Sequence, residues 1–286
     1  MLASLIVSLS MSYTLLRASD RSLAGTGLRH TSGRIVNGLS ESKFSFGDGG
    51  ETFTISEISD YEEGCGIGRN IWEASVALSC FLASYSESMG RTLEIGAGVG
   101  LVGHSIASNS SKARVVMTDH FAPLVDNLAS SLLRNDLKAT TALLDWREPE
   151  LADAVASGSF DTVVGADVIY YYPDVKPIAA ILQHLLAEAG GTAWIASPDY
   201  RAAEIGQALA ATLRDKHGAI VDEEKYILVS EVGEIGDEAE QTETDKEDAI
   251  VHRRDFFGGA GNDSGGGEPE AGHSIFRVRF PAVAKG

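Results

Sequence analysis

The stretch Arg91–Gly103 decides the fold, and it reads R-T-L-E-I-G-A-G-V-G-L-V-G. Its first part, Thr92-Leu93-Glu94-Ile95, is an apolar run of the β type, and it leads directly into Gly96, Gly98, Gly100 and Gly103. A small-residue stretch suited to a helix follows. The order is therefore strand, glycine turn and helix. Only glycine lets a backbone approach a ligand this closely in the φ range of such a turn.

The helix after this turn presents free N–H groups and a positive dipole end, so a nucleotide-like cofactor is the expected occupant. Two cofactor classes compete, because Gly98–Gly103 also matches the dinucleotide pattern G-x-G-x-x-G. Glu94 stands two positions before Gly96 and would repel a diphosphate. S-adenosylmethionine instead carries a sulfonium and an ammonium group, so Glu94 favours this methyl donor. The alternative is that the glycines form a tight turn with no ligand. Four glycines within eight residues make this purely structural interpretation less favoured.

Length and composition limit the other classes of function. The 286 residues suffice for one large α/β domain or two small ones, and the 44% of hydrophobic residues suffice for a core. The net charge of −18 argues against nucleic acid as a partner and favours a basic or neutral one. Cys65 and Cys80 indicate a reduced compartment, and Cys80 is expected in the core. No metal site is predicted.

The N-terminal region allows two interpretations. No run is long enough to span a membrane, and Met1–Leu16 lacks the positive charge that precedes a secretory signal. Residues 17–34 are rich in arginine, serine and threonine, as in an organelle transit peptide. The second interpretation, which we favour over a transit peptide, is that the N-terminal region is a disordered or strand-forming extension. We therefore expect a cytoplasmic monomer, with a mitochondrion or plastid as the location if the N-terminus is a transit peptide.

Apolar runs alternate with helical patterns along the rest of the chain, which predicts an α/β fold with a doubly wound, mostly parallel, seven-stranded sheet. Strands are expected at 92–95, 113–119, 139–146, 160–170, 192–197, 219–232 and 274–280, and helices at 71–82, 122–137, 175–189 and 201–217. A hairpin is expected around the glycines between Phe44 and Ile55. The predicted domains are a flexible or targeting N-terminal extension at 1–34, a β-rich cap at 35–70 and the main domain at 71–286. A mobile acidic and glycine-rich insertion is expected at about 233–272.

Polar and aromatic side chains at the predicted strand ends are the remaining site candidates, since open α/β sheets bind ligands at this edge. Asp119 is placed to bind the ribose hydroxyls of a nucleoside, or it caps a helix. Asp145 and Trp146 are placed to hold an adenine, although Trp146 is equally consistent with a rim aromatic. Asp167 follows a buried strand, so it is either a hydrogen-bonding hub or part of the site. Periodicity favours a core position for Trp72 over one in a pocket.

Five groups of residues together carry a resemblance to a known family: Trp72, E-I-G-A-G-V-G at 94–100, Thr118-Asp119, Leu144-Asp145-Trp146 and G-A-D-V-I-Y at 165–170. They resemble the methyltransferase-like family of seven-β-strand protein-lysine methyltransferases. The resemblance covers residues 71–232 and the last strand. It implies that Trp72, Gly96, Ala97, Gly98, Asp119, Trp146 and Ala166 line a site for S-adenosylmethionine. It also implies that residues 167–170 are the family's D-x-x-Y motif beside the acceptor amine, where Asp167 orients the amine and Tyr170 walls the channel.

The expected activity is methyl transfer from S-adenosylmethionine to a lysine of a protein substrate. The favoured partner is a basic protein, and we expect the chain to bind neither nucleic acid nor a membrane. Methylation of a histidine or of a small molecule would use the same donor site. Two further functions are compatible with the sequence: an NAD-dependent oxidoreductase, and a catalytically silent module that binds a partner through its acidic segment.

Overall fold

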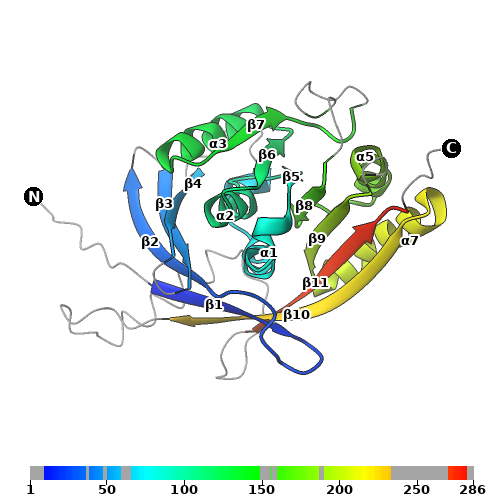
Figure 1. Cartoon of the computed structure of the whole chain (residues 1–286), viewed down its shortest axis with the longest axis horizontal. Coiled ribbons are helices and arrows are strands. Elements are labelled where there is room, and N and C mark those ends of the chain that lie inside the picture. Colours follow the sequence, from blue (N-terminus) through cyan, green and yellow to red (C-terminus); the bar gives the residue numbers. More distant parts are fainter. Residues whose placement is uncertain are drawn as a thin grey trace, which may run out of the picture.

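The computed structural model describes residues 10–36, 39–47, 50–58, 66–148, 155, 160–186, 190–232 and 270–281. These residues form one curved sheet in the order β4-β3-β2-β1-β10-β11-β9-β8-β5-β6-β7 (Figure 1). The strands are β1 (Ser10–Arg17), β2 (Leu28–Val36), β3 (Leu39–Phe46), β4 (Thr52–Ile58), β5 (Arg91–Glu94), β6 (Arg114–Asp119), β7 (Ala139–Leu143), β8 (Thr162–Ala166), β9 (Thr192–Pro198), β10 (Ile220–Val232) and β11 (Glu270–Arg279).

The strands from β7 to β10 contain the predicted doubly wound unit. Strands β7, β6, β5, β8 and β9 are mutually parallel, and β11 joins β9 in the antiparallel direction, followed by β10. The chain order reverses at β5, which lies between β6 and β8. The carboxyl ends of β5 and β8 therefore flank the crevice where such sheets bind ligands. The prediction of a mostly parallel seven-stranded sheet is confirmed for this part.

The N-terminal strands extend this sheet further than predicted. The expected hairpin is present as β3 and β4, in which Phe44 pairs with Phe53. However, β1 and β2 also belong to the sheet, because β1 pairs with β10 on one side and with β2 on the other. From Ser10 onward, the extension predicted at 1–34 thus contains β1 and most of β2, which agrees with the strand-forming alternative and not with a flexible or targeting segment. Alternating burial along β1 explains this, since Tyr13 and Leu15 face the core.

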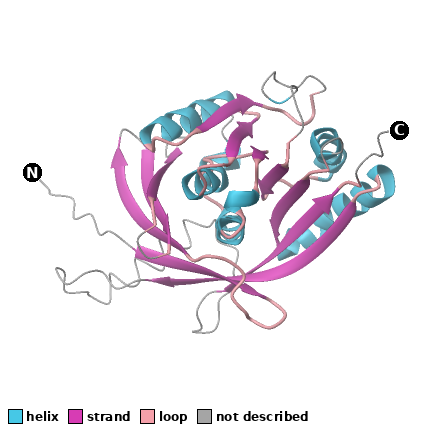
Figure 2. Cartoon of the chain, in the orientation of Figure 1, coloured by secondary structure: helices cyan, strands magenta, loops and turns pink. Residues whose placement is uncertain are grey.

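The helices cover both faces of the sheet (Figure 2). One face holds α1 (Glu73–Ala83), α2 (Leu101–Asn109) and α3 (Ala122–Arg134), and the N-terminal strands curve around this side (Figure 1). The other face holds α5 (Val175–Leu186) and α7 (Gln207–His217). Each face has its own apolar cluster, one with Tyr13 and Phe53 and the other with Phe160. Cys80 is buried in the first cluster, as predicted.

Short helices complete the elements: η1 (Gly66–Arg69), η2 (Ser86–Ser88), η3 (Tyr172–Asp174), α6 (Asp199–Arg201) and the π-helical turn η4 (Ala202–Gly206). The predicted helix at 201–217 is therefore divided, and its end at Gly218 is as expected, since this glycine adopts φ +64° after the last turn. The predicted insertion overlaps β11, which begins at Glu270. Its remainder, residues 233–269, lies outside the described residues, as does Cys65.

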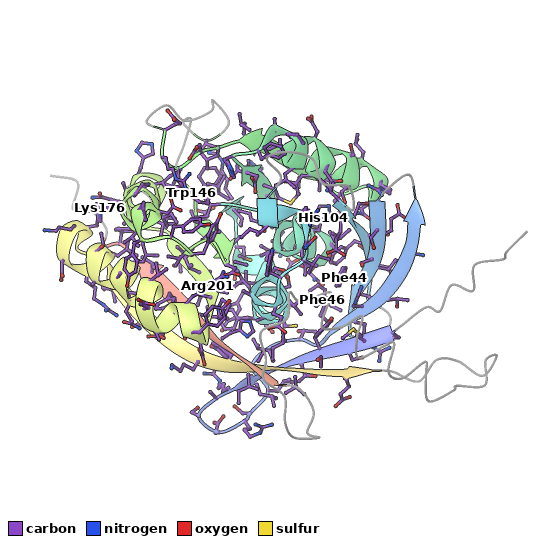
Figure 3. All side chains as sticks on the ribbon, turned by 180° about the vertical axis from the view of Figure 1, so that it is seen from behind. Phe44, Phe46, His104, Trp146, Lys176 and Arg201 are labelled. Carbon is purple, nitrogen blue, oxygen red and sulfur yellow. The ribbon has the colours of Figure 1, made fainter. Side chains whose placement is uncertain are left out.

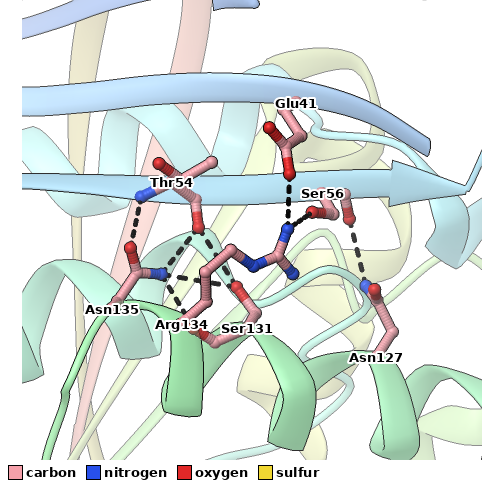
Figure 4. Close-up of polar contacts among 7 residues, drawn as sticks. All are labelled: Glu41, Thr54, Ser56, Asn127, Ser131, Arg134 and Asn135. Atoms are coloured by element: carbon pink, nitrogen blue, oxygen red, sulfur yellow. Dashed lines mark hydrogen bonds and ion pairs between the residues drawn. The ribbon is translucent and has the colours of Figure 1, made fainter. Parts of the chain in front are cut away.

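Helix α3 closes the free edge of β4 with its side chains (Figure 4). Asn135 Oδ1 accepts the N–H of Thr54 at 2.7 Å, and its Nδ2 donates to the carbonyl of Thr54 at 2.7 Å. Ser131 also donates to this carbonyl, and Asn127 donates to the carbonyl of Ser56. These side chains satisfy backbone groups of β4 that lack a neighbouring strand. Within the described residues, no helix has the length and apolar character needed to cross a membrane.

Candidate active site

The glycine turn between β5 and α2 has the conformation that its sequence requires. Gly96, Gly98 and Gly100 have φ values of +58°, +56° and +85°, in the left-handed region that side chains disfavour. Space is also restricted, because a Cβ on Gly96 would lie 2.9 Å from Val168 Cγ1. A Cβ on Gly98 would lie 2.6 Å from the carbonyl oxygen of Gly68. Glycine is thus required here for both backbone conformation and close packing.

Glu94, at the end of β5, is buried beneath this turn. Its Oε2 accepts the N–H of Gly103 at 2.9 Å, which satisfies one free donor in the first turn of α2. Burial raises the pKa of Glu94 to about 8, although the hydrogen bond from Gly103 opposes the rise and the charge of Asp119 adds to it. A bound cation would favour the ionised carboxylate. Glu94 therefore combines a structural role in the turn with a position at the cavity.

Asp119 is buried at the end of β6 and connects the neighbouring loops. Its Oδ2 accepts the N–H of Gly98 at 3.0 Å, and its Oδ1 accepts the N–H of Phe121 at 3.1 Å. His120 Nδ1 lies 3.2 Å from Oδ1, and this contact raises the pKa of His120. Within the described residues, Oδ1 has two contacts and Oδ2 only one, so Oδ2 is left able to accept a ligand hydroxyl. Asp119 does not cap α3, since the N-cap residue of that helix is Phe121 and its side chain forms no capping hydrogen bond.

A cavity of about 290 Å³ opens at the carboxyl ends of β5, β6 and β8. Its walls include the glycine turn, the η1 segment before α1, Leu124 of α3 and the segment after β8. Three carboxylates line it: Glu94, Asp119 and Asp167. No lysine or arginine of the described residues does so. A diphosphate would meet repulsion here without a basic partner, whereas a cationic ligand would be stabilised.

Asp167 lies immediately after β8 and is held by an ion pair. Its Oδ1 lies 2.5 Å from Arg201 Nη1, and its exposed fraction is 9%. Burial raises the pKa of Asp167, and the Arg201 guanidinium opposes this rise. The residue also adopts φ +54°, an uncommon conformation for aspartate. Asp167 thus has the hydrogen-bonded partner expected of a hub, and it also lines the cavity.

Aromatic side chains surround the entrance near Asp167. Tyr170 is partly buried and lines the cavity, and burial, followed by the nearby Asp174 and Asp119 charges, raises its pKa. Tyr171 also lines the cavity and contacts Tyr170 edge to face, with ring centroids 4.7 Å apart. Arg201 Cζ lies 6.0 Å from the centroid of the Tyr170 ring. One cation is therefore shared by Asp167 and the adjacent tyrosine.

The two predicted tryptophans contribute to the cavity wall. Trp72 is the N-cap residue of α1, and its Nε1 donates to the carbonyl of Ile67 at 2.8 Å. This bond fixes the indole against η1, so Trp72 is a pocket residue, whereas periodicity favoured the core. Trp146 packs on the glycine turn, with its ring 3.2 Å from the Cβ position of Gly96; it is labelled in Figure 3.

Asp145 does not line the cavity, in contrast to the prediction that it holds an adenine. Its Oδ1 accepts the N–H of Arg147 at 2.9 Å and closes a local turn after β7. This turn directs Trp146 to the cavity instead. The other predicted residues, Trp72, Glu94, Gly96, Ala97, Gly98, Asp119, Trp146, Ala166, Asp167 and Tyr170, all line the same cavity.

A family model described as lysine methyltransferase matches residues 53–203 of this chain. This match spans more than half of the 286 residues and includes the glycine turn and the D-x-x-Y motif. The chain belongs to the lysine methyltransferase family. The match begins within β4 and ends in η4, so it includes most of the elements that form the cavity.

Curated relatives agree with this assignment. The chain is 29% identical over 137 residues to the mouse protein-lysine methyltransferase METTL21E, which covers 44% of this chain and 55% of the relative. It is 31% identical over 139 residues to the mouse protein N-lysine methyltransferase METTL21A, with coverage of 46% and 61%. It is 26% identical over 148 residues to mouse EEF1A lysine methyltransferase 3, with coverage of 50% and 61%. The chain thus spans about half to three fifths of the length of these relatives.

The residues present fit S-adenosylmethionine. The carboxylates of Glu94 and Asp119 suit its ammonium and sulfonium groups and its ribose hydroxyls, and the apolar surfaces of Trp146 and Ala166 suit the adenosine. The glycine turn leaves its narrow space open only because no Cβ is present. No group of three or more histidine, cysteine or acidic residues within the described part of the chain is arranged to hold a metal.

Sequence reasoning missed several cavity residues. Gly68 lies against the glycine turn, and His120 and Tyr171 lie beside predicted residues. Arg201, which pairs with Asp167, was also missed. The signal for Arg201 was its place just after β9, because the carboxyl end of that strand lies beside the end of β8. Gly68 had only the weak signal of a glycine-rich segment, G-I-G at 66–68, before the first helix.

Proposed function

We propose that the protein transfers a methyl group from S-adenosylmethionine to the side-chain amine of a lysine in a protein substrate. The observation that carries this proposal is the single cavity that joins the glycine turn to Asp167 and Tyr170 and is lined by carboxylates without a lysine or arginine of the described residues. Family membership supports it. The relatives named as protein-lysine methyltransferases support a protein as the acceptor.

When bound, S-adenosylmethionine supplies an electrophilic methyl carbon on a sulfonium. The chain must hold a lysine amine in line with this carbon and in its neutral form. The ordinary lysine pKa of about 10.4 leaves roughly one amine in a thousand neutral at pH 7. Burial next to the positive charge of the donor disfavours the ammonium form of this lysine. Asp167, which lines the same cavity as the partly buried Tyr170, orients the amine through its carboxylate. The ion pair with Arg201 opposes the rise in the pKa of Asp167 that burial causes, and it fixes the direction of the carboxylate.

A basic partner and a cytoplasmic location are further parts of the proposal. The net charge of −18 supports attraction to a basic protein. The location is supported by β1 and β2, because removal of residues 1–34 as a transit peptide would take away β1 and most of β2 from the sheet.

Calorimetry with S-adenosylmethionine and with NAD tests the cofactor. We expect micromolar binding of the methyl donor, on the order of −7 to −8 kcal/mol, and no binding of NAD. Gly96→Arg should abolish binding, because its side chain would enter the space beside Val168 and Trp146. Gly190→Arg is the matched control, since Gly190 has φ +68° but no atom within 4 Å of a Cβ. Binding of NAD alone would contradict the proposal.

Mass spectrometry of a proteome incubated with labelled S-adenosylmethionine tests the acceptor. We expect label on lysine in the presence of the wild-type protein and none with Gly96→Arg. Label on histidine or only on small molecules would replace the lysine assignment. Binding of the donor without transfer to any acceptor would indicate a silent binding module.

A further inference from the structure

Exposed aromatic residues lie on the two segments that border the cavity at Tyr171 and Asp167. Tyr171, Tyr172 and Tyr200 are 58%, 54% and 67% exposed, and we call these three residues the tyrosine rim. They come from two separate segments, one after β8 and one after β9. Tyr171 lines the cavity itself, and Tyr200 adjoins Arg201, the partner of Asp167. Large exposed aromatic side chains on a protein surface commonly mark a binding site.

The rim has the chemistry of a cation-binding surface. Arg201 Cζ lies 5.3 Å from the centroid of the Tyr200 ring, so the chain's own guanidinium already uses one of these rings. The Tyr172 hydroxyl donates to Glu204 Oε1 at 3.3 Å, which holds a carboxylate beside the rings. Tyrosine faces together with a carboxylate favour a lysine or arginine side chain over a neutral or acidic one.

The nearby arginines do not compete with such a ligand for the carboxylate. Arg201 is paired with Asp167, and Arg147 is paired with the buried Asp174 through two bonds of 2.6 and 2.9 Å. Glu204 is exposed and forms no ion pair within the described residues. Its charge is therefore available to a partner that binds beside Tyr172, the residue that follows Tyr171 of the cavity wall.

We propose that the tyrosine rim and Glu204 form the docking surface for the substrate segment around the methylated lysine, and that they select a segment with a second cationic side chain beside this lysine. This inference rests on the proposed function, because it assumes that a lysine-bearing segment enters the cavity. It adds the substrate class, a basic segment rather than an isolated lysine, and the surface that recognises it.

Three fluorescent nine-residue peptides test this docking surface. Each has one central lysine, flanked on both sides by arginine, by alanine or by glutamate. Binding is measured by anisotropy with S-adenosylhomocysteine at saturation. We expect the arginine-flanked peptide to bind about five- to tenfold tighter than the alanine-flanked one, and the glutamate-flanked peptide to bind weakest. Equal binding of all three peptides would overturn the inference.

Variants of the tyrosine rim and of Glu204 distinguish binding at this surface from a general attraction between the acidic protein and a basic peptide. Glu204→Gln and the double variant Tyr172→Leu with Tyr200→Leu should each reduce the arginine preference to within about threefold, because the cation loses its carboxylate or its ring faces. Asp215→Asn, an exposed position at the far end of α7, removes the same charge as Glu204→Gln and should keep the preference. An equal loss in Asp215→Asn would assign the preference to net charge and overturn the inference.

Methyl transfer to the same peptides is measured in parallel with radiolabelled donor. The arginine preference without transfer to any peptide would contradict the proposed function and would leave a cation-binding surface without its role in substrate docking. Transfer to all three peptides with equal affinity would support the proposed function and contradict the docking surface. Failure of the docking surface is therefore distinguishable from failure of the proposed function.

Discussion

Asp167 combines two roles that its sequence position left open. It is buried and paired with Arg201, as a hydrogen-bonding hub would be, and it also lines the cavity beside Tyr170. Its left-handed φ of +54° is strained for a non-glycine residue. This conformation is consistent with a position selected for its direction toward an acceptor and not for stability alone.

We expect Asp167→Ala to abolish methyl transfer while the affinity for S-adenosylmethionine stays within a few-fold. The variant also leaves Arg201 without its partner, which should destabilise the fold by about 3–5 kcal/mol. Asp174→Asn is the matched control, because it weakens the ion pair of another buried aspartate, here with the half-exposed Arg147, at a position outside the cavity lining. Activity and melting temperature are measured on both. Full transfer by Asp167→Ala would show that the D-x-x-Y assignment is wrong.

His104 determines a pH dependence of stability. This residue of α2, labelled in Figure 3, is fully buried. Its Nδ1 contacts the Gly100 carbonyl oxygen at 2.7 Å, and its ring stacks on Phe53. Burial lowers the pKa of His104 from 6.5 to about 4. Below pH 6.5 the unfolded chain therefore binds a proton that the folded protein does not. The stability contribution is complete above pH 6.5 and is lost as the pH falls toward 4.

We expect this loss to reach about 3 kcal/mol, from a pKa gap of about 2.5. Urea unfolding of the wild type and of His104→Phe between pH 7 and 4 measures it, and the difference between the two profiles isolates His104. Glu57 affects stability in the opposite direction, because burial raises its pKa to about 7. Since Glu57 is present in both proteins, its contribution to the free energy of unfolding cancels in the difference between the two profiles. Parallel profiles would contradict the assignment.

At the scale of elements, α3 takes the place of a neighbouring strand at the edge of β4. The side chain of Asn135 accepts from the Thr54 N–H and donates to its carbonyl, as the backbone of an adjacent strand would do. Arg134 adds bonds to Glu41 of β3 and Ser56 of β4, each at 2.7 Å (Figure 4). The N-terminal strands are thus attached both to β10 through β1 and to α3.

Asn135→Ala tests this attachment. We expect it to lower the free energy of unfolding by about 1–3 kcal/mol, because it leaves the Thr54 N–H without a partner. Ser130→Ala is a control on the same helix, since its hydroxyl is exposed and bonds only locally to the Asp126 carbonyl; its effect should stay below about 0.5 kcal/mol. Chemical denaturation compares the two, and an equal effect would contradict a special role for the edge contacts.

At the scale of the whole molecule, the N-terminal strands are part of the folding unit. Tyr13, Phe44 and Phe53 share one apolar cluster with Val76 and Leu78 of α1. Glu57 of β4 also accepts the N–H of Ile71 at 2.9 Å, next to the cavity residue Trp72. The strands therefore bury one side of the helices that support the donor site.

We expect a chain without residues 1–58 to lose cooperative unfolding and to expose apolar surface, because one face of α1 and α2 would be left uncovered. Thermal circular dichroism and binding of a hydrophobic dye measure this, with a chain that begins at Ser10 as the control. An unchanged melting temperature after removal of residues 1–58 would show that these strands are an independent addition.

Local rules in the sequence determined the doubly wound core and most of the candidate site. The glycine turn was predictable because only glycine allows its φ values, and Asp119, Trp146 and Asp167 were predictable because the ends of parallel strands meet at one edge. Ala166 followed only from the family resemblance. The helix predicted at 122–137 is present as α3, and its buried leucines, Leu124, Leu128 and Leu132, are spaced four residues apart as on one helix face.

Only the tertiary structure decided contacts between segments far apart in the chain. Three examples are the pairing of β1 with β10, the ion pair of Asp167 with Arg201 and the hydrogen bonds between Asn135 and Thr54. The residues in each pair are so far apart in the sequence that no periodic pattern connects them. Asp145 and Trp146 show the same limit at short range, because one local turn decided which of them faces the cavity. Sequence patterns report which face of an element is apolar, whereas the partner of that face depends on how all elements pack together.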